Sequence, residues 1–126
     1  MEVTDEQKRD LARRMLEIME TMEEALQYMQ TQLDELKLEA AKELFDDFAA
    51  AAGRLTELLP EIFMEDRKDQ LVKVLEDLRD AISGMQDAFV GGELSQMQQV
   101  LAQVMTPAFT AWRDEARQHL LTWAAV

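Results

Sequence analysis

Apolar side chains recur along most of the chain at alternating steps of three and four residues. This spacing gathers them on one face of an α-helix, and such a face is stable only when it packs against another element. The pattern predicts helices over about 5–34, 38–59, 67–90 and 93–123. The apolar runs are Leu11, Met15, Ile18, Met22, Ala25, Met29, Leu33 and Leu36; Ala41, Phe45, Phe48, Ala52, Leu55, Leu59 and Ile62; Leu71, Leu75, Leu78, Ile82, Met85 and Phe89; and Leu94, Met97, Leu101, Val104 and Ala108, continued by Phe109, Trp112, Ala116, Leu120 and Trp123.

Local signals mark some of the helix ends. Thr4 followed by Gln7 is typical of a capping box at the start of the first helix. Pro60 indicates the end of the second helix, and Asp66 is a candidate cap for the third. Gly91-Gly92 predicts the turn between the third and fourth helices.

No glycine or proline separates the first two runs. One helix over 5–59 would be roughly 80 Å long at 1.5 Å per residue, which is too long for a compact domain of this size. We therefore expect a bend near 34–38. In the fourth run the apolar stripe shifts by one residue at Pro107, which predicts a kink or a break there. The expected fold is all-α: a single domain over 1–126, folded as an up-and-down four-helix bundle.

The composition narrows the functions that this bundle can have. The chain carries 26 acidic and 13 basic residues, for a net charge of −13, and it has no cysteine. This charge disfavours nucleic acid and anionic membrane surfaces as partners. No apolar stretch is long enough to span a bilayer, and the missing cysteines fit a reducing, cytoplasmic compartment. Residues 1–66 hold 18 acids and 7 bases, whereas residues 67–126 hold 8 and 6, so the acidity is concentrated in the first half.

The most specific candidate for chemistry is a set of carboxylates, Glu20 and Glu23 followed by Glu43 and Asp46. Their spacing resembles the ExxE…ExxD motif of all-helical nucleoside triphosphate pyrophosphohydrolases of the MazG type. That resemblance implies magnesium held by four carboxylates from two helices, which would suit a hard cation that activates water. The helical phase favours another interpretation, because it places all four on the outside, away from the apolar faces.

Other catalytic patterns are weaker. His119 is the only histidine, so a di-iron site built from two Glu-x-x-His pairs is excluded. We expect it to pair with Asp114 or Glu115, and we predict neither a catalytic residue nor a cofactor. The sequence contains neither a serine in a nucleophile-elbow motif nor a glycine-rich phosphate-binding loop.

Two features point to binding. Met15, Met22 and Met29 share one helical face with Met19 beside them, which suits either core filling or an adaptable groove for partner helices. The stretch 94–112 has nineteen residues without a charge, and interface centres are depleted of charge; a central helix with neutral filler is the alternative. The candidate partner-binding residues are Gln96, Gln99, Gln103, Phe109, Trp112 and Trp123, followed by Met15, Met19, Met22 and Met29.

Two stretches resemble a group of short, acidic, uncharacterised all-helical proteins of Bacillales-type bacteria. They are LDELKLEAAKELFDDFAAAAGRLTELLP and FVGGELSQMQQVLAQVMTPAFTAW, and the resemblance covers residues 20–115. Its most distinctive part is the T-P-A-F-x-x-W segment from Thr106 to Trp112. The resemblance implies a shared bundle of unknown role and brings no active-site residues.

The sequence therefore favours a non-enzymatic protein-interaction module, such as a small regulator or an export-type chaperone, with a protein partner or a second copy bound to it. The first alternative is the magnesium-dependent pyrophosphohydrolase. The second is an acidic mimic of nucleic acid, whose first half competes for a basic DNA-binding surface.

Overall fold

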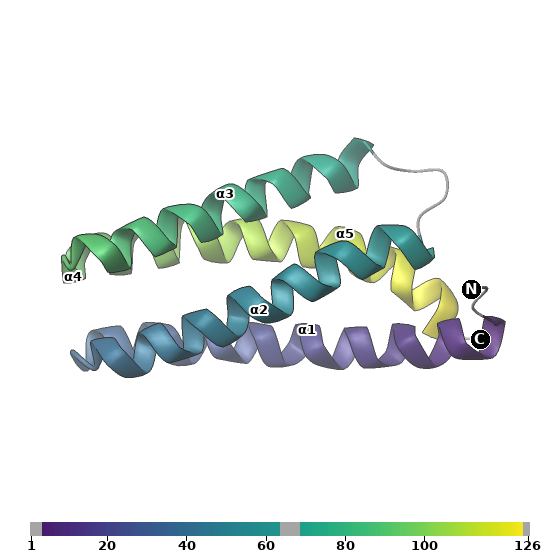
Figure 1. Ribbon diagram of the computed structural model, residues 1–126, viewed down its shortest axis with the longest axis horizontal. Coiled ribbons are helices and arrows are strands. Elements are labelled where there is room, and N and C mark those ends of the chain that lie inside the picture. Colours follow the sequence, from purple (N-terminus) through teal and green to yellow (C-terminus); the bar gives the residue numbers. More distant parts are fainter. Residues whose placement is uncertain (1–3, 64–68, 125–126) are drawn as a thin grey trace.

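A computed structural model describes residues 4–63 and 69–124, and the side chains of 4–59 and 70–124. All elements in this part of the chain are helical, as expected (Figure 1). The last three follow one another without a loop, so we call residues 94–124 the last helix. The elements are α1 (Asp5–Asp34), α2 (Leu38–Phe63), α3 (Asp69–Gly91), α4 (Leu94–Val100), the π-helical turn η1 (Leu101–Met105) and α5 (Thr106–Ala124).

The helices form an up-and-down bundle. α1 packs against α2 on one side and against the last helix on the other, while α3 packs against the last helix. α2 and α3 approach one another less closely (Figure 1). The start of α1 meets the end of α5, because Arg13 donates a hydrogen bond to the Ala124 carbonyl at 3.4 Å and the Lys8 ammonium lies 4.8 Å from the centre of the Trp123 ring.

The first helix begins and ends where the sequence predicts. At its start the Gln7 N–H donates to the Thr4 hydroxyl at 3.2 Å, and the Thr4 N–H donates to the Gln7 side chain at 3.0 Å, which confirms the capping box. The expected bend is a three-residue turn, residues 35–37, that places α2 antiparallel to α1.

That turn uses a leucine where glycine is the usual residue. Leu36 has a φ of 63°, in the left-handed region, and it donates to the Leu33 carbonyl while Lys37 donates to the Gln32 carbonyl. This pair of bonds is the Schellman pattern of a helix C-terminus, in which the left-handed position favours glycine. Leu36 is 69% exposed. The expectation that it belongs to the apolar face of α1 is wrong, because the chain leaves the helix before this residue.

Replacing Leu36 with glycine is therefore expected to stabilise the protein by roughly 0.5–1 kcal/mol. Glycine adopts the left-handed conformation without the steric strain that leucine has there, and this gain exceeds the larger loss of backbone entropy when a glycine folds. Chemical denaturation followed by circular dichroism measures the change. The same substitution at Leu58, which is exposed within α2, is the control and should destabilise by about 1 kcal/mol. Equal losses at both positions would contradict this account of the turn.

The second helix runs further than the sequence indicates. Pro60 does not end it, and α2 continues to Phe63 rather than stopping at 59. A proline in the last turn of a helix removes a single backbone hydrogen bond, which need not break the helix there. The proposed Asp66 cap, and residues 67–68 of the expected third helix, lie outside the described residues.

The core contains most of the predicted apolar positions. Met15, Met19, Met22 and Met29 are each 2% exposed or less. Besides Leu36, two positions expected in the core are on the surface instead: Ile18 is 40% exposed and Val104 is 47% exposed. Their neighbours Met19 and Met105 take the buried places. The largest core side chains are aromatic: Phe45 and Phe48 of α2, and Phe109 and Trp112 of α5. The half-buried Phe89 of α3 packs against them, with its ring centre 5.4 Å from that of Phe45.

The π-turn explains the shift of the apolar stripe near Pro107. Met97, Leu101, Met105 and Phe109 are all buried although they follow one another at steps of four. In a regular α-helix, three steps of four residues would move these positions progressively around the helix axis. A π-turn contains one extra residue, so the four side chains stay on the same side of the helix. The Thr106 N–H donates to the Leu101 carbonyl, five residues back. The expected kink at Pro107 is thus a π-turn that precedes the proline.

Candidate functional site: an uncharged face with a pocket

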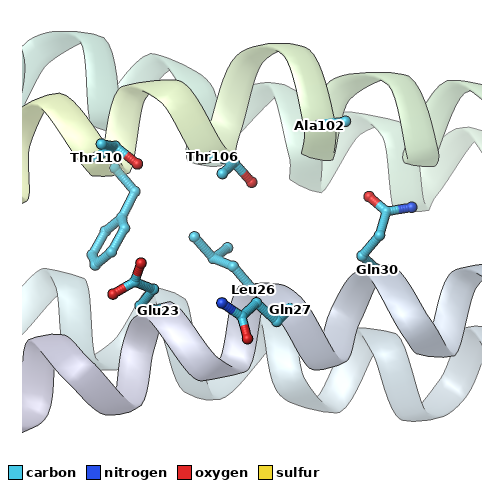
Figure 2. Close-up of a pocket in the computed structure, with 8 residues that line it drawn as sticks. Glu23, Leu26, Gln27, Gln30, Ala102, Thr106 and Thr110 are labelled. Atoms are coloured by element: carbon cyan, nitrogen blue, oxygen red, sulfur yellow. The ribbon is translucent and has the colours of Figure 1, made fainter.

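A pocket lies between α1 and the last helix, beside the π-turn (Figure 2). It has a volume of about 290 Å³. In Figure 2, Leu26 and Gln30 project from α1 towards the last helix, while Thr106 and Thr110 project from the opposite side. The lining residues are Glu23, Leu26, Gln27, Gln30, Ala102, Thr106, Phe109 and Thr110.

The pocket exists because the last helix presents short side chains towards α1. Ala102, Thr106 and Thr110 succeed one another by four residues, so they occupy one side of the helix across the π-turn. None of them is long enough to reach α1. The floor is apolar, since Leu26 and Phe109 are both buried core residues.

Polar contacts join the two helices at each end of the pocket. At one end the Arg113 guanidinium contacts the Glu23 carboxylate at 2.7 Å. At the other end the Asp34 carboxylate accepts hydrogen bonds from Gln98 at 2.9 Å and from Gln30 at 3.0 Å. These contacts hold α1 and the last helix at a fixed separation on both sides of the pocket.

Arg113 is the most buried partner in these contacts, with 17% of its side chain exposed. Burial lowers its pKa, but the hydrogen bonds to Glu23 and Asp114 outweigh that effect, so the pKa of Arg113 is raised overall. The guanidinium also lies over the Phe109 ring, 5.9 Å from its centre. Arg113 therefore stays charged and neutralises Glu23 at the edge of the pocket.

The π-turn changes the backbone hydrogen bonding beside the pocket. In a helix the Ala102 carbonyl would accept from the N–H of residue 106 or 107. The Thr106 N–H donates to Leu101 instead, and Pro107 has no N–H. A π-turn of this kind is often found at functional sites.

The surface around the pocket is uncharged over a wide area. The chain has a second charge-free stretch, residues 25–33 of α1, and this stretch packs beside residues 94–112. Seven of the eleven glutamines lie on these two stretches. We call their surface the neutral face. It consists of Gln27, Gln30, Gln96, Gln99, Ala102, Gln103, Thr106 and Thr110.

The predicted contact residues divide into two groups. Gln96, Gln99 and Gln103 are exposed, and the Gln99 amide donates to Gln103 at 3.5 Å. Trp123 is half-buried against Lys8. The others lie in the core, where the face that carries them packs against the neighbouring helices, and of these only Phe109 lines the pocket. They are Met15, Met19, Met22, Met29, Phe109 and Trp112.

The four carboxylates of the hydrolase hypothesis do not meet. Glu20, Glu23, Glu43 and Asp46 are all exposed. Glu23 pairs with Arg113, and Asp46 pairs with Lys42. Among the side chains of residues 4–59 and 70–124, no three acidic or histidine groups come together in a way that could hold a metal ion. His119 lies 3.8 Å from Glu115, one turn before it, which is the pairing that the sequence indicates.

Sequence reasoning missed the α1 half of the site. It singled out the charge-free stretch of the last helix but not residues 25–33, whose nine uncharged residues were the available signal. A second hollow of about 280 Å³ lies between α2 and α3. All its lining residues, charged Glu57 and Arg79 among them, come from α2 and α3, so it lies outside the neutral face.

The fold and the site together define a class: an all-α four-helix bundle with an uncharged, pocketed face on an otherwise acidic surface. Within the described ranges no helix has the length and apolarity needed to cross a lipid bilayer. The chain belongs to the family of the domain of unknown function DUF8042, whose profile matches residues 10–115. That range includes the whole neutral face. No curated protein and no solved structure matches the chain.

Proposed function

We propose that the protein is a non-enzymatic protein-interaction module that binds its partner through the neutral face. The observation that carries the proposal is the pairing of two charge-free stretches, 25–33 and 94–112, on the surface of a chain with a net charge of −13. An exposed helix surface ordinarily carries charges, whereas the centre of an interface is depleted of them, above all of lysine and glutamate.

The chemistry of the face supports binding rather than catalysis. Its exposed groups are amides and hydroxyls, which donate and accept hydrogen bonds without the cost of desolvating a charge. The pocket adds a concave apolar floor in which a partner side chain can be buried. Buried anchors of this kind supply most of the binding energy at an interface. A reducing, cytoplasmic setting fits the chain, which contains no cysteine.

A charge placed on the neutral face should break the interaction. In Gln103→Lys the new ammonium would lose its hydration at the interface, so we expect partner recovery to fall at least about tenfold. The measurement is quantitative affinity purification from the source cells, with light scattering of the purified chain to detect self-association. Gln86→Lys introduces the same change on an exposed site of α3 and should leave recovery unchanged. Equal recovery for the two variants would contradict the proposal.

A further inference from the structure

The surroundings of the neutral face indicate the kind of partner that it fits. Carboxylates outnumber cations around its border. The residues concerned are Glu20, Glu23, Glu24, Asp34, Glu93 and Asp114 on the acidic side, and Arg113 and Arg117 on the basic side. Arg113 pairs with Glu23 and Asp114, so these three residues together carry a charge of −1 and the border as a whole stays negative.

This border argues against a second copy as the occupant. Two copies docked through the same face would bring their acidic borders together, and each copy carries a net charge of −13. Like charges placed opposite one another in an interface oppose association. A partner with an uncharged centre and basic residues towards its two ends would instead meet carboxylates at both ends of the neutral face.

The shape of the site indicates a helix. The pocket lies in the groove between two antiparallel helices, and Ala102, Thr106 and Thr110 form one wall along it. A groove between helices accepts the ridge of a third helix, whose side chains at steps of three and four residues enter it in turn. A pocket of about 290 Å³ with an apolar floor suits one large aliphatic or aromatic side chain.

We infer that the neutral face binds a basic amphipathic helix of another protein, with one apolar side chain inserted between Leu26 and Phe109 and with Lys or Arg residues towards both of its ends. This inference rests on the proposed function and names the partner chemistry for the same surface. The apolar side chain of the partner is buried in the pocket, and its burial stabilises the complex. The flanking cations pair with border carboxylates such as Glu20 and Glu24.

The test uses two synthetic helical peptides that share a leucine ridge, one with lysine flanks and one with glutamate flanks. Fluorescence polarisation measures their affinities for the full chain. The lysine peptide should bind at least about tenfold more tightly than the glutamate peptide at low salt, and its affinity should fall as salt is raised. Equal affinity of the two peptides would overturn the inference.

Matched variants separate pocket binding from general attraction to an acidic protein. Ala102→Phe fills the pocket and should weaken the lysine peptide at least about tenfold. Ala50→Phe makes the same change on an exposed site of α2 that does not line the pocket, and it should have no effect. Paired changes Glu20→Gln and Glu24→Gln should weaken binding and flatten its salt dependence. If both phenylalanine variants behave alike, the pocket is not the docking site and the inference is wrong.

The outcomes also distinguish this inference from the broader proposal. If the purified chain sediments as a dimer that Gln103→Lys dissociates, the neutral face is an interface but its occupant is a second copy, so only the inference fails. If Gln103→Lys and Gln86→Lys leave partner recovery equal, the proposed function fails as well.

Discussion

Replacing Trp112 with alanine is expected to lower the free energy of unfolding by about 3–5 kcal/mol, because a tryptophan removed from a close-packed core leaves a cavity that its neighbours only partly fill. Trp112 is 1% exposed, and its ring centre lies 6.1 Å from that of Phe109. A loss of this size is a large share of the 5–15 kcal/mol that typically stabilises a domain. Guanidinium denaturation followed by circular dichroism measures the loss without relying on the fluorophore that the substitution removes.

The chain provides a matched control in its other tryptophan. Trp123 is half-buried near the end of α5, where it lies against Lys8. Trp123→Ala removes less buried surface than Trp112→Ala, together with the cation–π contact to Lys8, so it should cost roughly 1 kcal/mol. A smaller loss for Trp112→Ala than for Trp123→Ala would mean that Trp112 is not at the centre of the core.

Deleting Gln103 is expected to destabilise the protein by about 3 kcal/mol, although Gln103 itself is exposed. The deletion removes the extra residue of the π-turn. The buried residues before and after the turn could then stay on the same side of a regular α-helix. Pro107 would then stand in the interior of that helix. There it lacks an N–H and its ring presses on the carbonyl four residues before it. Thermal and chemical denaturation both measure this loss.

The cause is tested by removing the proline. In the Gln103 deletion combined with Pro107→Ala, the helix should become regular and stability should return to within about 1 kcal/mol of the Pro107→Ala protein. If the deletion costs nothing while Pro107 is retained, the π-turn is not what accommodates the proline. If the combined variant stays as unstable as the deletion, residues of the π-turn contribute contacts of their own.

The helices of this fold could be predicted closely from the apolar pattern. The first helix was expected over 5–34 and occupies Asp5–Asp34. The turn at Gly91-Gly92 was also predicted, and Gly92 has a φ of 76°, which glycine adopts without strain. Such features depend on neighbours in the sequence, which is why the sequence reveals them.

The choice between adjacent apolar residues could not be predicted. Ile18 and Met19 are both apolar, and either can continue a run at steps of three and four. The direction from which neighbouring helices approach decides which of them is buried, and that direction is a property of the packed bundle. On the last helix the π-turn likewise determines which of two neighbouring apolar residues is buried, and Met105 is buried in place of Val104.

The candidate site, too, could be predicted from the sequence only in part. The outward orientation of Glu20 and Glu43 followed from the helical phase and is confirmed by their exposure. The neutral face needs two stretches about seventy residues apart to lie together, and only the folded chain brings Gln27 beside Thr106. The short side chains that leave space for the pocket have no distinguishing pattern in the sequence, where they are typical of any helix.

The most direct test of the central claim uses the absence of cysteine from the chain. A single cysteine placed at Gln103 reports on the neutral face, and one placed at Gln86 reports on an exposed site of α3. The rate of alkylation of each thiol is measured in the purified chain and in the source cells. Our account predicts that the Gln103→Cys thiol reacts at least about tenfold more slowly in cells while the Gln86→Cys thiol reacts equally in both settings. Equal reactivity of the Gln103→Cys thiol in the two settings would show that nothing covers the neutral face, and it would contradict the account.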